Sequence, residues 1–414
     1  MPATPSTARA INDRLALRLL QQEGPLTAGQ LKQQTGLSRP TVADLVDRLT
    51  AAGLITVVGE SGEQRRGPNA RLYGIVADRA HLAALDVRTE GVFVLVSDLV
   101  GRVLAEASAP IGGDTGTGPA VEQAVSAVES AAKEAGAGRL HTVGIGAPGL
   151  IDPATGDLRD SAGLPAWHRS LAAALQDRLP GARVTLENET NLAALAEQRE
   201  GAARDRSTFV LLWLGHGVGA AVVLDGTLRR GASGGTGEIG FLPVPGTRAL
   251  PSATDCEGGF HSLTGAAAVT ALAAECGRPV SGPADGPGAA LAVRAAVAEV
   301  AGESMAVRAP AAGESLPAEA SPARRFLHTL ADRVAVGAAS VVAVLDPGCV
   351  VLGGEVGHAG GAVLAGLVED RLRRMSPLPT EVRASGLGGG AVLRGALLTA
   401  RDRAQDELFA PHGR

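Results

Sequence analysis

A glycine-rich loop that contains one acidic residue is the part of this sequence best suited to bind a ligand. The loop spans residues 231–240, and Glu238 lies near its end. Glycine lets the backbone approach a ligand closely, and successive backbone N–H groups can hold an anion. A lone glycine-rich loop is a weak signal, so a β-meander with tight turns is the competing interpretation.

Two apolar runs precede this loop and would position it. Residues 209–224 are mostly apolar, with a Gly-His-Gly turn at positions 215–217, and Asp225-Gly226 follows. Asp-Gly is a strong signal for a two-residue β-hairpin. We therefore expect two strands joined by a tight turn, then a hairpin at Asp225, and then the glycine-rich loop.

The first eighty residues have the pattern of a DNA-binding module. Three short apolar helices are expected, and Thr27 and Ser38 are placed to cap the second and the third. Gly36 separates these two helices, as in the helix-turn-helix plan. Two short strands, over residues 54–58 and 71–75, would then form a wing.

The third helix, residues 39–52, is expected to place its N-terminal residues in the major groove of DNA. An arginine there can bind a guanine edge, hydroxyl groups can contact phosphates, and basic residues of the wing would enter a narrow minor groove. The competing interpretations are a winged helix used for protein contact and a solvated basic loop. The residues expected to contact DNA are Ser38, Arg39, Pro40, Thr41, Asp44, Arg65, Arg66 and Arg71.

Composition restricts the class of protein further. Hydrophobic residues make up 45% of the chain and aromatic residues only 2%, so the cores must be aliphatic. The net charge of −5 argues against a chain that binds nucleic acid over its whole surface. Residues 1–78 carry a small net positive charge and the remainder is negative, which is the sign that an N-terminal DNA-binding domain needs.

The three cysteines are far apart and form no Cys-x-x-Cys pair, which indicates a reducing compartment. The start of the chain, MPATPSTARA, lacks the apolar segment of a signal peptide. We see no apolar run near the roughly 20 residues that a membrane span needs. We therefore expect a cytoplasmic protein that has no membrane partner.

The order of these motifs resembles the ROK family, which comprises bacterial sugar kinases and sugar-responsive repressors. The resemblance rests on strand, Gly-x-Gly-x-Gly, strand, Asp-Gly, and then Arg-Gly-Ala-Ser-Gly-Gly-x-Gly-Glu-Ile-Gly over residues 230–240. The N-terminal segment resembles the MarR-like winged helix of ROK repressors. The resemblance implies an α/β chain, with a winged helix-turn-helix over residues 1–78 and a two-lobed actin-like (ribonuclease H-like) ATPase/sugar-kinase fold over residues 79–414. A variable insertion is expected at about residues 279–322, with two short helices at 289–300 and 304–307.

Kinases of this family hold ATP phosphates with Asp-x-Gly-Gly-Thr in a first hairpin. The corresponding residues here are Asp86-Val87-Arg88-Thr89-Glu90, so both glycines are replaced by residues with side chains. This departure argues against ATP turnover, although Arg88 suggests an anion in the same place. The degenerate phosphate site implied by the resemblance consists of Asp86, Arg88, Gly215, Gly217, Gly353 and Gly354.

The sugar site implied by the family is also altered. Residues 187–191 match a Glu-Asn-Asp-Ala-Asn motif whose Asp is the general base, and here that position is Glu189. The extra methylene misplaces the carboxylate, so we expect no catalytic residue. A purely structural interpretation also fits, because acids and Asn are favoured at a helix N-terminus. The residues expected to bind an effector are Gly149, Asn188, Glu189 and Glu238.

The family's zinc loop is degraded in this sequence. Phe241 replaces a zinc-binding and sugar-binding histidine, and Cys256 is the one cysteine that remains of three. A structural zinc needs four ligands, so we expect no metal. The position of a sugar-contacting Glu stays open among Phe260, His261 and Ser262.

The sequence therefore predicts a DNA-binding transcriptional regulator, a repressor, that uses no cofactor. Its degenerate kinase-like domain would sense a small molecule, a sugar or a sugar derivative, and would mediate assembly into a homodimer or a dimer of dimers. The expected DNA partner is a palindromic double-stranded operator. One alternative is an ATP-dependent sugar kinase with an appended DNA-binding domain. Another is an interaction module that binds neither DNA nor ligand.

Overall fold

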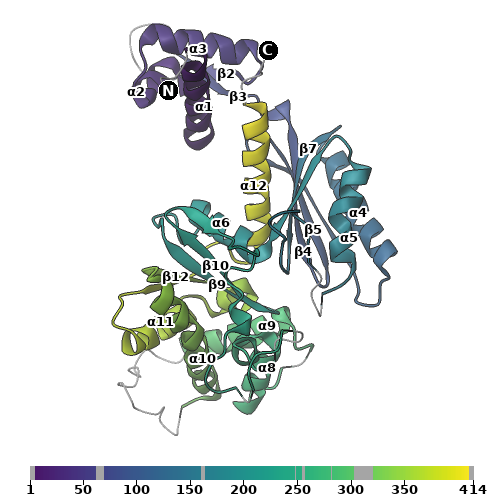
Figure 1. Ribbon diagram of the computed structural model, residues 1–414, viewed down its shortest axis with the longest axis vertical. Helices are drawn as coiled ribbons and strands as arrows, with labels where there is room; N and C mark the ends of the chain where they lie inside the picture. The colour runs from purple at the N-terminus through teal and green to yellow at the C-terminus, as the bar shows by residue number, and fades with distance from the viewer. Residues whose placement is uncertain are drawn as a thin grey trace.

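Three sheets organise the chain into a small N-terminal unit and two lobes (Figure 1). The strand orders are β1-β3-β2 in the N-terminal unit, β6-β5-β4-β7-β8 in the first lobe and β11-β10-β9-β12-β13 in the second. The computed structural model describes residues 5–61, 70–159, 164–247, 249–253, 257–280, 282–302 and 320–409.

The N-terminal unit is a winged helix, as predicted. Thr27 and Gln30 form a reciprocal capping box at the second helix, and Ser38 Oγ accepts a hydrogen bond from Thr41 N at 3.3 Å at the third. Both caps begin their helices where the sequence indicated. The elements are α1 (Pro5–Glu23), β1 (Leu26–Thr27), α2 (Ala28–Thr35), α3 (Arg39–Ala51), β2 (Ile55–Glu60) and β3 (Arg71–Ile75).

The first lobe begins with three strands, which are followed by a helix and a fourth strand. Strands β4, β7 and β8 are parallel, while β4, β5 and β6 are antiparallel. Helices α4 and α5 cover one face of this sheet and α12 covers the other (Figure 1). The elements are η1 (Ala77–Arg79), β4 (His81–Arg88), β5 (Gly91–Asp98), β6 (Val103–Pro110), α4 (Thr117–Glu134), β7 (Leu140–Ala147), α5 (Trp167–Arg178) and β8 (Arg183–Asn188).

The second lobe contains the hairpin predicted at Asp225-Gly226, where both residues have positive φ (53° and 73°). Its elements up to the core helices are α6 (Glu189–Glu200), β9 (Phe209–Leu214), β10 (Val218–Leu224), β11 (Thr227–Arg229), η2 (Ile239–Phe241), α7 (His261–Thr264), α8 (Ala266–Glu275) and α9 (Gly286–Gly302). The remaining elements are α10 (Pro322–Leu345), β12 (Cys349–Gly353), α11 (Gly354–Met375), β13 (Glu381–Ala384), η3 (Gly388–Gly390) and α12 (Ala391–Leu408).

Helix α9 lies in the segment that was expected to be an insertion. Its side chains Ala289, Val293 and Ala296 are fully buried in the core of the second lobe. The segment is rich in Ala and Gly, and these small residues let the helix pack closely against its neighbours in the core. The helix predicted at residues 289–300 is confirmed as α9, the variable insertion stays a prediction, and residues 304–307 lie outside the described part of the chain.

Helix α10 is, among the described residues, the one helix long and apolar enough to cross a membrane by length and composition. Half of its most apolar window is buried inside the fold. Phe326, Leu330 and Val334 have no exposed surface and belong to the core of the second lobe. Its apolar character is therefore explained by packing.

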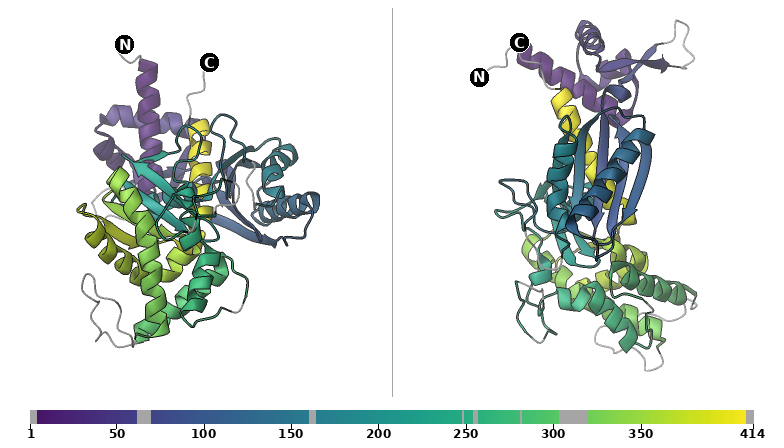
Figure 2. Two further views of the ribbon diagram at one scale, coloured as in Figure 1. Left: turned by 60° about the horizontal axis from the view of Figure 1, so that its bottom comes forward. Right: turned by 90° about the vertical axis from the view of Figure 1, so that its right-hand side faces the viewer.

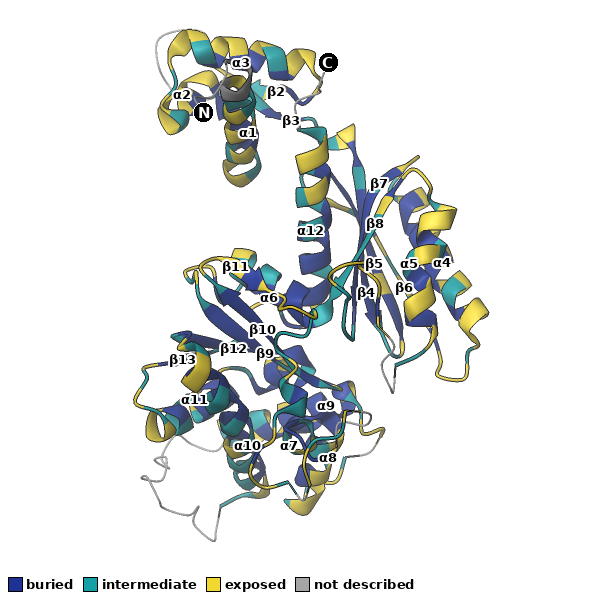
Figure 3. Ribbon diagram, viewed as in Figure 1, coloured by how far each residue is buried: buried dark blue, intermediate teal, exposed yellow. Residues whose placement is uncertain are grey.

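Helix α12 extends from the junction of the two lobes to the winged helix (Figures 1 and 2). Its first turns are buried and its last turns are partly exposed (Figure 3). The helix packs closely on the first-lobe sheet, because a Cβ at Gly144 would lie 2.6 Å from Ala396 O. It thus connects the region between the lobes to the DNA-binding unit.

Candidate ligand-binding cleft

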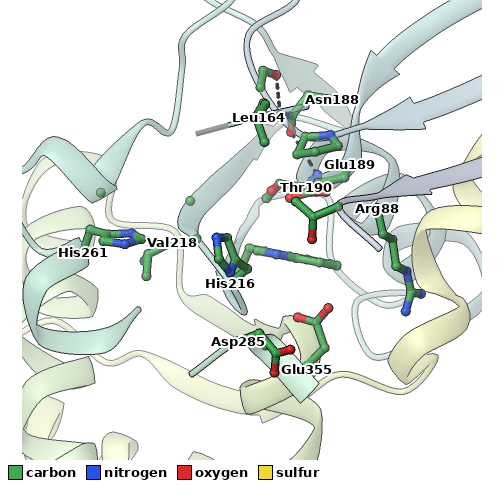
Figure 4. Close-up of a pocket in the computed structure, with 18 of the residues that line it drawn as sticks. Arg88, Leu164, Asn188, Glu189, Thr190, His216, Val218, His261, Asp285 and Glu355 are labelled. Carbon is green, nitrogen blue, oxygen red and sulfur yellow. Dashed lines mark hydrogen bonds between the residues drawn. The ribbon is translucent and has the colours of Figure 1, made fainter. Parts of the chain in front are cut away.

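A cleft of about 350 Å³ lies between the two lobes (Figure 4). Residues from both lobes line it, and most come from turns and helix starts rather than from strand centres. The lining residues are Arg88, Thr89, Glu90, Pro148, Gly149, Leu164, Asn188, Glu189, Thr190, Trp213, His216, Gly217, Val218, Gly219, Glu238, Gly240, Phe241, His261, Asp285, Gly286, Pro287 and Glu355.

Arg88 fills the place where the family's glycines would leave room for phosphate. Its Nε and Nη2 donate to Asp86 Oδ2 at 3.0 and 2.7 Å, and Nη2 also donates to Gly389 O at 3.0 Å. The guanidinium lies over the Phe93 ring at 4.6 Å from its centroid. Arg88 is therefore directed to an internal carboxylate and to η3, and the expectation that it marks an anion site stays a prediction.

The other predicted phosphate-site glycines come together at the end of β9. Gly353 pairs with Trp213 in the parallel register, and a Cβ at Gly354, where φ is 75°, would lie 2.4 Å from Leu214 O. Gly215 and Gly217 form the adjoining turn between β9 and β10. The structure thus places the four glycines of the predicted phosphate site next to one another.

Glu355 is a cleft residue that the sequence analysis did not identify as part of the site. A Cβ at Gly215 would lie 2.3 Å from Glu355 Oε2, and a Cβ at Gly286 would lie 3.2 Å from its Cδ. The side chain therefore lies between these two glycines. Its Oε2 is buried and has no hydrogen-bond partner among the described residues. An acid directly after Gly353-Gly354 was the signal in the sequence.

Asn188 joins the two segments expected to bind an effector. Its Oδ1 accepts from Thr190 N at 2.9 Å and from Asn191 N at 3.2 Å, so it caps α6. Its Nδ2 donates to Gly149 O at 2.9 Å, and Gly149 has φ of 106°. The structural interpretation of this segment is confirmed, and the cap also fixes the turn that lines the cleft.

Partial burial shifts the pKa of three carboxylates that line the cleft. Burial raises the pKa of Glu189 to about 8, and the negative charges of Asp86 and Glu355 add to this shift. Burial also raises the pKa of Glu355 and that of Glu238. Glu189 is the first residue of α6, and Glu238 precedes η2, so both predicted effector residues reach the same cleft.

His261 occupies the cleft among the three positions left open for the family's sugar-contacting Glu. Phe260 is fully buried, where Gly337 leaves room for its ring, and Ser262 Oγ accepts from Gly258 N at 3.0 Å. Burial, and then the neighbouring His216, lower the pKa of His261. Asp285 was missed as a site residue because it belongs to no recognisable motif.

The zinc loop is only partly described, because Cys256 lies outside the described residues. Phe241 lines the cleft in place of the family's histidine. Among the described residues, no group of three or more His, Cys, Asp or Glu side chains is arranged to hold a metal ion. The expectation of a protein without zinc stays a prediction that metal analysis can test.

The structure describes six of the eight residues that were predicted to contact DNA. Arg39 and Pro40 are exposed at the start of α3, while Arg71 is exposed at the start of β3. Asp44 accepts from Arg48, which also pairs with Asp13 at 2.6 Å, so this acid belongs to an ion-pair network within the unit. Thr41 Oγ1 lies 2.8 Å from Ser38 Oγ. Arg65 and Arg66 lie outside the described residues.

Comparison with known proteins matches two parts of the chain to two different families. The profile of the ROK family matches residues 83–403, and that of the MarR family matches residues 11–67. The xylose repressor of Caldicellulosiruptor bescii is 26% identical over 242 residues, which cover 57% of this chain and 59% of that protein. The chain therefore matches less than two thirds of the length of this curated relative.

Two solved structures have a similar fold. A ROK family transcriptional regulator, described as a homologue of the E. coli MLC protein, has a TM-score of 0.73 and 20% identity, with 97% of this chain and 98% of that chain covered. The ROK hexokinase of Thermus thermophilus has a TM-score of 0.59 and 29% identity, with 79% of this chain and 99% of that chain covered. The predicted combination of a winged helix and a kinase-like body is confirmed at the level of the fold.

Proposed function

Because the chain belongs to the ROK family, we propose that it is a DNA-binding transcriptional regulator, a repressor, with a kinase-like body that senses a small molecule. The observation that carries this proposal is that Arg88 and Glu355 fill the phosphate side of the cleft in a chain that begins with a winged helix. Residues 1–78 would bind DNA and residues 79–414 would bind the effector.

DNA recognition is assigned to the start of α3 and to the wing. Arg39 is exposed there and can form two hydrogen bonds with a guanine edge in the major groove. Ser38, Thr41 and the wing arginines would contact phosphates and the minor groove. A two-fold-symmetric operator requires two copies of this helix, so we expect a homodimer or a dimer of dimers.

The effector is assigned to the cleft between the lobes. Gly149, Asn188, Glu189 and Glu238 line it, and a carboxylate or an amide can hydrogen-bond several hydroxyl groups of a sugar. A ligand changes DNA affinity only if it binds one conformation of the protein better than another. Because the cleft is shared between two lobes, a ligand that contacts both favours the closed arrangement.

Loss of kinase activity follows from the same residues. A phosphate in the first hairpin would have to displace the Arg88 guanidinium from Asp86, and one at the Gly215 turn would meet the Glu355 carboxylate. A phosphate and a carboxylate that lie close together repel each other strongly where water is excluded. The general-base position holds Glu189, one methylene longer than the family's Asp, so no catalytic residue, cofactor or metal is assigned.

The alternative function is that of an ATP-dependent sugar kinase with an appended DNA-binding domain. The similarity to the ROK hexokinase of Thermus thermophilus, at 29% identity, favours it. ATP-dependent phosphorylation of any sugar in a hexose panel by the purified protein would establish this alternative. We expect no turnover above that of a heat-inactivated sample.

The experiment that tests the proposal is selection from genomic DNA. Purified protein is incubated with sheared DNA from its own genome, and the retained fragments are sequenced. Enrichment of a two-fold-symmetric motif supports the regulator, and the neighbouring genes then suggest effectors. If no motif is enriched, with or without cell extract as a source of effector, the regulator proposal is wrong.

A further inference from the structure

The charge of the cleft is markedly unbalanced. Among the described residues that line it, the only lysine or arginine is Arg88, and that charge is matched by Asp86 at 2.7 Å. The acidic side chains that line it are Glu90, Glu189, Glu238, Asp285 and Glu355. A ligand that enters the cleft therefore meets an excess of carboxylates.

One of these carboxylates lacks the partner that a buried acid normally has, and a second has a strongly shifted pKa. Glu355 Oε2 is buried without a hydrogen-bond partner among the described residues. Glu189 is half-buried at the cleft, and its burial, followed by the negative charges of Asp86 and Glu355, raises its pKa. Burying an ionised carboxylate without a counter-charge is costly, so both groups gain free energy from an arriving cation.

The geometry places these acids around one space. Asp285 and Glu355 lie near each other at one wall of the cleft, and the Arg88 guanidinium lies to one side of them (Figure 4). Glu189 lines both this cleft and the small cavity beneath Arg88 that Glu355 also lines. Trp213 lines the same two spaces, and an indole face attracts a cation.

A bound metal ion is the other way to neutralise such a group. Among the described residues, however, no group of three or more His, Cys, Asp or Glu side chains is arranged to hold one. An organic cation is larger and can contact carboxylates that are spread around a cleft, as these are. A phosphorylated sugar would add negative charge and would find no unmatched arginine among the described lining residues.

We propose that the effector carries a protonated amine, as in an amino sugar or another polyhydroxylated amine, and that the ammonium group binds at Glu355 and Asp285, with Glu189 adding negative charge to the same cleft. This inference rests on the proposed function, because it assigns the chemical class of the effector in the same cleft. Hydroxyl groups of the ligand would then face Glu238 and His261, which line the same cleft. Neutral and phosphorylated sugars of the same shape would bind less well.

Isothermal titration with matched ligands tests the inference. Each set holds one ring stereochemistry with an amine, a hydroxyl or a phosphate: D-glucosamine, D-glucose and glucose 6-phosphate, and the corresponding galactose and mannose compounds. We expect the amine in at least one set to bind about tenfold more tightly than its neutral partner, as for a desolvated charge pair. Equal or tighter binding of the neutral or phosphorylated compounds overturns the inference, and so does failure of every amine to bind.

Two variants locate the amine site. Glu355→Gln removes the charge and keeps the shape, so it should abolish the preference for the amine. Glu134→Gln, on an exposed turn of α4, makes the same change of charge and should keep it. Circular dichroism shows whether Glu355→Gln folds. If it does not fold, Glu189→Gln provides a second test. If the folded variants keep the full preference for the amine, the assignment is wrong.

The outcomes for the two proposals are separate. Enrichment of an operator motif from genomic DNA without any preference for amines leaves the regulator intact and removes the amine inference. Amine binding without an enriched motif supports an amine ligand for the cleft and removes the regulator proposal. The two experiments therefore fail independently.

Discussion

Gln405, near the end of α12, donates a hydrogen bond from Nε2 to Gln21 Oε1 of α1 at 2.7 Å. The same Nε2 lies 3.0 Å from Leu99 O, and Gln21 Nε2 donates to Val100 O at 3.2 Å. This junction holds the winged helix against the first lobe. At its other end, α12 follows η3, where Gly389 O accepts from Arg88. One helix therefore connects the cleft to the DNA-binding unit.

The first prediction concerns this junction. Gln405→Ala removes both hydrogen bonds, each worth about 1 kcal/mol, so the winged helix should open more easily from the body. Amide hydrogen exchange in α1 should become faster, while exchange in β4 and β7 stays the same. Gln33→Ala, on the exposed side of α2, is the matched control and should leave α1 unchanged. Unchanged exchange in α1 of the Gln405→Ala variant would contradict a holding role for the junction.

The second prediction concerns Arg88. Arg88→Ala leaves the buried Asp86 carboxylate without its partner, which costs about 3–5 kcal/mol of unfolding free energy. Burial already raises the pKa of Asp86, and losing Arg88 raises it further. Asp86 can then be protonated at low pH, so the loss should be greater at pH 8 than at pH 4.5. Urea unfolding of the wild type and the variant at the two pH values measures this loss of stability.

A double variant serves as the control for Arg88. Arg88→Leu combined with Asp86→Asn removes both charges and should recover much of the stability that Arg88→Ala loses. If Arg88→Ala alone is as stable as the wild type at pH 8, the ion pair has no structural role. The interpretation of a closed phosphate site would then lose its main support.

The third prediction follows from Glu189. Its pKa in the folded protein is about 8, above the ordinary 4.5, so folding favours the protonated form. Its contribution to stability is therefore present below about pH 4.5 and is lost as the pH rises through about 8. The slope is at most about 1.4 kcal/mol per pH unit. Glu189→Gln should be more stable than the wild type at pH 8 and similar to it at pH 4.5.

The Glu189 experiment uses the difference in unfolding free energy between wild type and variant across this range. Glu134→Gln, an exposed substitution of the same charge, should give a flat difference curve. A flat curve for Glu189→Gln as well would mean that the carboxylate is hydrated. It would also weaken the inference of an amine ligand, since that ligand must compensate a buried charge.

The sequence predicted the elements that local chemistry determines. Thr27, Ser38 and Asp225-Gly226 act within a few residues of themselves, and each cap or turn lies where it was expected. Glu355 and Asp285 could not be assigned in this way. They reach the cleft because β12 pairs with β9 and because α9 packs beside them, and these contacts join segments far apart in the chain.

Arg88 also shows that the partner of a side chain is hard to predict from the sequence. The sequence predicted a side chain at the place where the family's glycines leave room for a phosphate, and the structure directs this side chain to Asp86. Its partner could not be predicted with certainty, because an arginine beside a cleft binds either an external anion or an internal acid. Asp86 lies two residues earlier on the same face of β4, and this alternation of the strand favours the internal pair.

The fourth prediction concerns the glycine-rich loop. Gly237 has φ of 93°, and a Cβ there would lie 1.8 Å from Ala220 O, whereas a Cβ at Gly217 would have nothing within 4 Å. Gly237→Ala should lower the unfolding free energy by more than the roughly 1–2 kcal/mol of left-handed strain alone, because the backbone of β10 must also move. Gly217→Ala should be nearly neutral. Urea midpoints that do not differ between the two would show that the loop rearranges freely.

The last prediction concerns Arg39 and the operator recovered from genomic selection. Arg39 is exposed at the start of α3, so Arg39→Ala should leave the unfolding midpoint unchanged while it weakens operator binding by at least about tenfold. Arg374→Ala, exposed near the end of α11 in the second lobe, makes the same change of charge and should have no effect. Fluorescence anisotropy at one salt concentration compares the three proteins. Because both substitutions remove one positive charge, an equal loss of affinity would indicate a general charge effect, whereas a loss confined to Arg39→Ala indicates base recognition by α3.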